Sequence, residues 1–282
     1  MIARIRQLRA APIWLLDVEI DAVHTQRTLN GPGDIERHQV GDGTANTLWA
    51  TVEHVLARHP RGVRRIGAHI PDHHWTVARL PITDGSEPRQ AMRQHLASCL
   101  PDGMEHYTYA VHVSRPSGSP VAHAFISQKH VMEGLVDRAK EAKLKVHRVQ
   151  PRIISLINAA TQGQQLDAGL NLIVDRSASA ITLAVVRNGQ LERCRIVPQA
   201  DSGTEDDLEL AHIHATAEAY GAARQQPLST LATPRAVALF SEPDRVQTLA
   251  VQALEDPDFH GIHTALRGLA WTDRMEDQSH DS

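Results

Sequence analysis

The sequence contains little of what several functional classes require. It has only two cysteines in 282 residues, too few for a disulfide framework, which favours a reducing compartment. Lysine and arginine (29) are fewer than aspartate and glutamate (33), so the basic excess typical of nucleic-acid-binding proteins is missing. No apolar run reaches the roughly 18 residues that a membrane span needs, and no hydrophobic leader follows Met1. We therefore expect a cytoplasmic protein.

The motifs of common enzyme classes are also missing. The sequence has no Gly-x-Ser-x-Gly elbow, no Walker loop and no Cys-x-x-Cys pair. Histidines are plentiful, but zinc needs three or four convergent ligands, and histidines one or two positions apart point to different faces. Cys99 and Cys194 lie in apolar periodic patterns, which predicts buried, inert thiols. We expect no metal site, and surface or capping roles for the histidine pairs His54/His59, His73/His74 and His212/His214.

One pattern occurs twice in the chain. An apolar strand ends in Asp17, and a second one ends in Asp175, 158 positions later (175 − 17). Each strand is followed by a hairpin turn, Asn30-Gly31-Pro32-Gly33 in the first copy and Asn188-Gly189 in the second. A Glu-Arg pair then follows each turn, at 36–37 and at 192–193. The repeat predicts a protein built from two similar halves.

Groups of strands alternate with helices in both halves, which predicts an α/β architecture with helices covering the sheets. Near the end of the chain we expect a strand at 235–240 and helices at 243–254 and 261–270. The predicted division is a basic segment at 1–12, a first half at 13–74 and 151–168, an inserted α+β unit at 75–150, a second half at 169–271 and a disordered acidic tail at 272–282.

The order of these segments resembles the actin-like ATPases, and among them the PilM proteins of type IV pilus assembly and the GspL cytoplasmic domains of type II secretion. The resemblance covers about residues 13–240. It implies an actin-like, ribonuclease H-like duplicated fold with an inserted subdomain. The segments that carry it are 15–23, Val77-Ala78-Arg79-Leu80-Pro81, Cys99-Leu100-Pro101 with 107–113, 125–127 with 129–146, 171–186 and 193–198.

The chain departs from this family where the family binds nucleotide. Glycines there follow each strand-end aspartate, because only a residue without a Cβ lets the backbone approach a phosphate. Glu19 and Ser177 stand at those positions, and Glu19 would repel a phosphate. The family's adenosine-side Gly-Gly-Gly turn is expected after 235–240, where Ser241-Glu242-Pro243 stands. We therefore predict that ATP and magnesium do not bind.

The vestigial phosphate-loop positions implied by the resemblance are Asp17, Glu19, Asp175 and Ser177. For Asp17 and Asp175 we expect structural roles, in which they cap strand ends and orient hairpins. Two alternatives stay open: a divergent actin-like ATPase that still binds and hydrolyses ATP, and a filament-forming actin homologue.

The resemblance implies a pseudo-ATPase scaffold in a pilus or secretion assembly platform, cytoplasmic and peripheral to the bacterial inner membrane. Its expected partners are the cytoplasmic tail of a PilN-like or GspM-like membrane-anchored protein and the assembly ATPase, with no nucleic acid. By position, the tail would lie in a groove between the first subdomain and the inserted one. Trp75, Arg79 and Leu80 are the candidate contacts, although Trp75 and Leu80 could equally be core residues.

Overall fold

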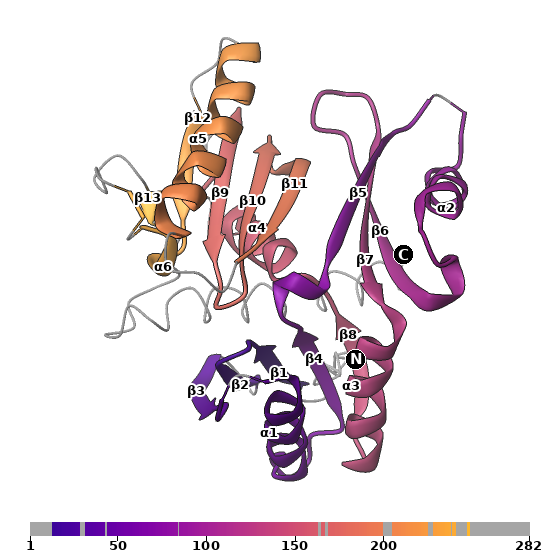
Figure 1. Cartoon of the computed structure of the whole chain (residues 1–282), viewed down its shortest axis with the longest axis vertical. Coiled ribbons are helices and arrows are strands. Elements are labelled where there is room, and N and C mark those ends of the chain that lie inside the picture. The colour runs from indigo at the N-terminus through magenta and orange to yellow at the C-terminus, as the bar shows by residue number, and fades with distance from the viewer. Residues whose placement is uncertain are drawn as a thin grey trace, which may run out of the picture.

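A computed structural model describes residues 13–28, 32–42, 44–83, 85–162, 165–166, 169–199, 205–224, 228–237, 239–240 and 247–248. A first lobe contains a five-stranded sheet in the order β3-β2-β1-β4-β8 (Figure 1). The hairpin strands β1 to β3 pair antiparallel, whereas β4 and β8 run parallel to β1. The strands are β1 (Ile13–Val18), β2 (Ala22–Thr28), β3 (Pro32–Gln39), β4 (Arg65–His69) and β8 (Lys145–Val149).

A second lobe repeats this sheet with the order β11-β10-β9-β12-β13. Its first three strands again pair antiparallel, and β12 and β13 again run parallel to β9. The turn between β10 and β11 has positive φ at Asn188 (50°) and Gly189 (75°), as a type I′ hairpin requires. The strands are β9 (Leu170–Arg176), β10 (Ala180–Arg187), β11 (Gln190–Pro198), β12 (Leu228–Ala232) and β13 (Gln247–Thr248).

The two lobes repeat each other down to single hydrogen bonds. The backbone N–H of Glu19 donates to the carbonyl of Ala22 (2.9 Å), and that of Ser177 donates to the carbonyl of Ala180 (3.0 Å). Both residues of the second pair stand 158 positions after those of the first, the same offset that separates Asp17 from Asp175. The predicted duplication is therefore confirmed.

Helices cover the sheets of both lobes. In the first lobe α1 (Ala45–Ala57) begins where the Thr44 side chain accepts a hydrogen bond from the Thr47 N–H, and it buries Leu48, Val52, Val55 and Leu56 on one face. It packs beside α3 (Lys129–Glu141). In the second lobe the covering helices are α5 (Glu205–Arg224) and the short α6 (Pro234–Val237).

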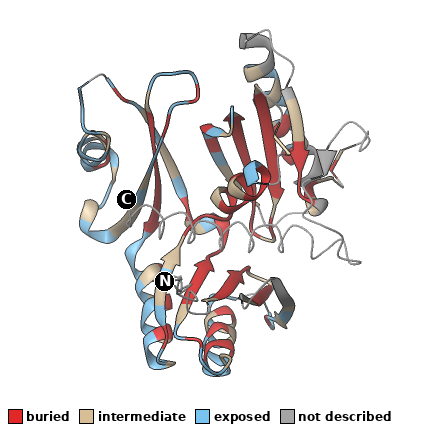
Figure 2. Cartoon of the chain, turned by 180° about the vertical axis from the view of Figure 1, so that it is seen from behind, coloured by how far each residue is buried: buried red, intermediate tan, exposed pale blue. Residues whose placement is uncertain are grey.

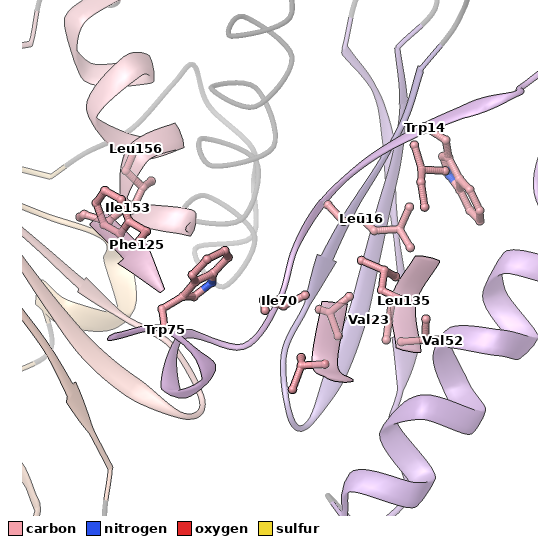
Figure 3. Close-up of a cluster of buried hydrophobic side chains, with 14 of the residues drawn as sticks. Trp14, Leu16, Val23, Val52, Ile70, Trp75, Phe125, Leu135, Ile153 and Leu156 are labelled. Carbon is pink, nitrogen blue, oxygen red and sulfur yellow. The ribbon is translucent and has the colours of Figure 1, made fainter. Parts of the chain in front are cut away.

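Helix α4 (Arg152–Gln162) packs between the lobes and joins their cores. Its residues Ile153, Leu156 and Ile157 belong to the same buried cluster as Leu16 of β1 and Ile173 of β9. Figure 3 shows Ile153 and Leu156 beside Trp75 and Phe125, with the first-lobe part of the cluster around Leu16. Figure 2 shows buried residues concentrated in the central strands of both sheets.

An inserted unit follows β4. After the 3-10 turn η1 (Asp72–His74) it forms a three-stranded sheet in the order β5-β7-β6, covered by α2. Met92 and Leu96 of α2 are fully buried against it. The elements are β5 (Thr76–Pro81), α2 (Pro88–Cys99), the turn η2 (Met104–His106), β6 (Tyr107–Ser114) and β7 (Val121–Gln128).

Three sequence predictions differ from the structure. The inserted unit was predicted at 75–150, but β8 pairs with β4 and α3 packs on α1, so 129–149 lie with the first lobe. The strand expected at 235–240 is instead the helix α6 with the turn that follows, and the strand before it is β12. Cys99 is exposed at the end of α2 rather than buried.

Other predictions fall partly or wholly outside the described residues. These are the basic segment 1–12, the helices at 243–254 and 261–270, and the tail 272–282.

Cys194 is buried as predicted, and burial raises the pKa of its thiol. Among the described residues, no group of three or more histidine, cysteine or acidic side chains is arranged to hold a metal ion.

Candidate functional site

The two strand-end aspartates meet between the lobes in a cluster of buried charged and polar side chains. Asp17 stands near the end of β1 and Asp175 near the end of β9. All members except Arg235 are at most 3% exposed. The cluster consists of Asp17, Glu19, His69, Asp72, Arg152, Ser155, Asp175, Thr182 and Arg235.

Arg152 is the centre of the cluster. One terminal nitrogen of its guanidinium lies 2.5 Å from Asp17 Oδ2 and 2.5 Å from Glu19 Oε1. Its Nε lies 3.0 Å from Asp175 Oδ2, across the boundary between the lobes. A single cation therefore contacts the aspartates of both halves.

The local sequence of Arg152 gives a signal that sequence reasoning missed. Arg152 is the first residue of α4 and stands next to Pro151, in a helix whose other buried residues are apolar except for Ser155. An arginine is unfavourable at the positive end of a helix dipole, and arginine is rarely buried unless it is paired. Its place in this helix indicates buried acidic partners, although it does not identify them.

Further contacts fix the orientation of the acidic groups. His69, which lies opposite Asp17 in the parallel pair β1–β4, has Nδ1 3.0 Å from Asp17 Oδ1 and Nε2 2.7 Å from Ser155 Oγ. Arg235 donates to Glu19 Oε2 at 2.8 Å and adds a second guanidinium from α6. Five elements of both lobes, β1, β4, α4, β9 and α6, thus contribute to one ionic network.

Asp72 extends the network to the second lobe. It accepts a hydrogen bond from Thr182 Oγ1 at 3.3 Å, and Thr182 lies opposite Asp175 in the β9–β10 pair. Burial, and next to it the charge of Asp175, raise the pKa of Asp72 to about 8. This environment therefore favours the protonated form of Asp72.

The remaining pKa shifts show that most of the charge in the cluster is compensated within the chain. Burial alone would raise the pKa of Asp17, but the Arg152 guanidinium and the His69 hydrogen bond more than offset it and hold that pKa well below its usual range. Burial opposes the charge of Arg152, yet Asp17 and Asp175 raise its pKa, so Arg152 stays charged. Burial raises the pKa of Glu19 against the opposing effect of Arg152.

The four vestigial positions are all buried, but their roles differ from those expected. The aspartates were expected to cap strand ends and orient hairpins, whereas both hold Arg152. The hairpins are closed instead by the N–H groups of Glu19 and Ser177. The Ser177 hydroxyl also accepts from the Ala180 N–H at 3.2 Å, so its side chain is used within the turn.

The position predicted for the adenosine-side turn depended on a strand at 235–240, but the strand is β12, which ends earlier. Because β12 ends at Ala232, Thr233 and the first residues of α6 follow it, and Arg235 of α6 donates to Glu19. The predicted Ser241-Glu242-Pro243 lies outside the described residues.

The three candidate partner contacts do not form one surface. Trp75 is 5% exposed and lies in the main core, the alternative role considered for it. Leu80 packs half-buried on the core of the inserted unit. The Arg79 Nε donates to the Glu192 carbonyl of β11 at 3.0 Å, a carbonyl that also accepts from His123 Nε2 at 3.2 Å. Arg79 thus connects the inserted unit to the second lobe.

Two cavities border the inserted unit. One, of about 350 Å³, lies between the end of β6, helix α4 and the β10–β11 turn. The other, of about 630 Å³, lies between the inserted unit and the first lobe. Its lining residues are Asp102, Glu105, His106, Tyr107, Gln128, Lys129, His130 and Glu133.

The duplicated sheet order, the inserted unit and the paired aspartates at the lobe boundary define the actin-like ATPase fold. Among solved structures, the chain is similar to the PilM–PilN type IV pilus biogenesis complex, with 12% identity, coverage of 93% of this chain and 99% of that chain, and a TM-score of 0.68. No protein-family model matches the sequence, and no curated protein matches it.

Two further solved structures are similar. One is the cytoplasmic domain of EpsL, an inner-membrane component of the type II secretion system of Vibrio cholerae (10% identity, 93% of this chain and 95% of that chain, TM-score 0.59). The other is a Bacteroides thetaiotaomicron protein with an actin-like ATPase fold (12% identity, 91% and 96%, TM-score 0.60). At these identities the comparisons establish the fold. No helix in the described part of the chain is long and apolar enough to cross a membrane.

Proposed function

We propose that this protein is a cytoplasmic scaffold subunit of a type IV pilus or type II secretion assembly platform, working without nucleotide. The observation that carries the proposal is the position of Arg152, which holds both strand-end aspartates at the lobe boundary. Magnesium and phosphate would have to displace a guanidinium that is already paired, buried and charged. Glu19 adds a carboxylate where a phosphate would approach.

The same network replaces what nucleotide does in a two-lobed protein. A ligand held by both lobes keeps them together, and here Arg152 and the Thr182–Asp72 bond connect them directly. The closed arrangement of the lobes then requires no ligand. This is the property expected of a permanent binding platform rather than a nucleotide-driven switch.

Adding Mg-ATP tests the nucleotide claim. A ligand at a hundred times its dissociation constant stabilises a protein by about 2.7 kcal/mol. We expect the urea unfolding midpoint to stay unchanged with millimolar Mg-ATP. A clear rise would support the runner-up function, a divergent ATPase, and sedimentation with and without ATP would test the filament alternative.

We further propose that the cavity between the inserted unit and the first lobe receives the cytoplasmic tail of a PilN-like or GspM-like membrane-anchored protein. Two observations support it: the fold is similar to that of the PilM–PilN complex, and a cavity of about 630 Å³ lies at this boundary. Neither observation concerns the assembly ATPase, which stays a proposed second partner.

A synthetic tail peptide tests this site by titration calorimetry. Glu133 lines the cavity from α3, and Asp137 stands one turn further along the same helix, exposed and outside the lining. Glu133→Lys removes a lining carboxylate and places a second cation beside Lys129, and should weaken peptide binding about tenfold, roughly 1.4 kcal/mol. Asp137→Lys, the matched control, should leave the affinity unchanged. Equal affinities in both variants would place the tail elsewhere.

A further inference from the structure

Exposed cations gather at the end of the first lobe that faces away from the inserted unit and the second lobe. Helix α1 ends there at Ala57 and α3 at Glu141, and β4 and β8 begin there. In Figure 1 this is the bottom of the molecule, one end of its longest axis. We call this group the basic pole; its members, all exposed, are Arg58, Arg61, Arg64, Lys140, Lys143 and Lys145.

These side chains belong to one surface because their backbones are in contact. The Lys145 N–H donates to the Arg64 carbonyl at 2.9 Å, where β8 starts beside β4. The Arg138 guanidinium lies 5.1 Å from the Trp49 ring centroid and holds α3 against α1. Two helix ends and two strand starts therefore lie together at this end of the first lobe.

The charge of the pole is not neutralised locally. Within the described part of the chain, none of the six cations has an ion-pair partner. Glu141 is the one acidic residue between Lys140 and Lys145, and Glu53 and Asp137 lie about one helical turn away from the cap. The pole therefore carries an excess of positive charge although the whole chain has a net charge of −4.

Lys143 supplies a second observation. Its φ is 60°, in the left-handed region, and it closes α3 in a Schellman arrangement in which the Leu144 N–H donates to the Ala139 carbonyl at 2.8 Å. Glycine is favoured at this position because a Cβ is unfavourable at positive φ. The chain has a lysine there, so a positive charge stands at the tip of the pole at the expense of backbone preference.

We propose that the basic pole binds the anionic lipid headgroups of a membrane surface. Clusters of four to eight lysines and arginines attract such surfaces, with a contribution of about fivefold in affinity for each side chain near the lipid. A planar anionic surface can contact all of these side chains at one end of the molecule. Nucleic acid fits the pole less well, because none of its six members is an aromatic side chain on which bases could stack.

This contact is independent of nucleotide and would orient the scaffold with its inserted unit and second lobe away from the bilayer. Sedimentation with vesicles tests it, using phosphatidylcholine with and without phosphatidylglycerol. The full chain should bind only the anionic vesicles, and binding should weaken as salt shortens the Debye length.

Two matched triple variants locate the contact. Arg64→Gln, Lys143→Gly and Lys145→Gln together should reduce affinity about a hundredfold, from three contributions of about fivefold. The control triple changes exposed arginines of the inserted unit, Arg89→Gln, Arg93→Gln and Arg115→Gln, and should change affinity less than twofold.

Lys143→Gly alone separates binding from folding. It should weaken vesicle binding about fivefold while the urea midpoint stays the same or rises, because glycine relieves the backbone at positive φ. The proposal is overturned by equal binding to neutral and anionic vesicles, or by equal losses in the two triple variants. It is also overturned if vesicle binding is lost only when Arg4, Arg6 and Arg9 are replaced. It is overturned as well if an oligonucleotide displaces the protein from the vesicles at a lower concentration than competing lipid does.

Discussion

Replacing Arg152 by methionine is the sharpest perturbation of the lobe boundary. The substitution keeps much of the side-chain volume and removes the cation shared by Asp17, Glu19 and Asp175. Removing one partner of a buried ion pair costs about 3–5 kcal/mol, because the other charge is left uncompensated. With three carboxylates affected, we expect Arg152→Met to lose about 5 kcal/mol of unfolding free energy.

A compensated variant distinguishes the loss of charge balance from a packing defect. Adding Asp17→Asn and Glu19→Gln to Arg152→Met removes two of the uncompensated charges, and uncharged replacements of buried ion networks are often close to neutral. Urea unfolding at neutral pH should show that this triple variant regains most of the lost stability. The single variant alone cannot make this distinction.

An exposed ion pair serves as the control. Lys129 and Glu133 lie 3.6 Å apart with side chains 54% and 59% exposed. Lys129→Met should change stability by less than about 0.5 kcal/mol. The reasoning is refuted if Arg152→Met loses no more than this control, or if the triple variant is no more stable than the single one.

Three further predictions concern single side chains. Asp72 binds its proton more tightly in the folded state, where its pKa is about 8 against an ordinary 3.8, so the stability of the protein should fall as pH rises from 3.8 to 8. In urea unfolding, the wild type should lose roughly 2 kcal/mol between about pH 6.5 and 8, and Asp72→Asn should remove this loss. Burial lowers the pKa of His123 from 6.5 to about 4, so the stability that neutral His123 contributes is present above pH 6.5 and is lost as the pH falls to 4. In circular-dichroism titrations, His123→Gln should therefore lose less stability than the wild type between pH 6.5 and 4. Trp75→Ala should lose about 3–5 kcal/mol in urea unfolding, because Trp75 is buried in the main core. Lost tail binding with near-normal stability would contradict this and assign the side chain to the interface.

The sequence was sufficient to predict the duplicated strand pattern. Hairpins and alternating apolar residues are local signals, and the repeat of Asp17 at Asp175 needed only an offset to be seen. The sequence did not show in the same way that residues 129–149 lie with the first lobe. The pairing of β8 with β4 joins segments about 80 residues apart and leaves no local pattern.

The short apolar run at 235–240 shows a different limit. A run of this length is compatible with a strand or a buried helix, and periodicity alone does not separate them. Pro234, which fits the first turn of a helix, was the local signal for α6. The ionic cluster was partly visible, because Asp17, Glu19 and Asp175 were named from sequence. Its other charged members, Arg152, His69, Asp72 and Arg235, come from four other segments, and only the fold brings them together.

The contact between the inserted unit and β11 has a consequence for self-assembly. Strand β11 is the edge of its sheet, and an uncovered edge is a template onto which a neighbouring copy can add a strand. Here the carbonyls of Leu191 and Glu192 already accept hydrogen bonds from Ser114, Arg79 and His123. Sheets of two copies therefore cannot be joined through these two carbonyls while the inserted unit stays docked, so a second copy pairing with this end of β11 would first have to displace the inserted unit.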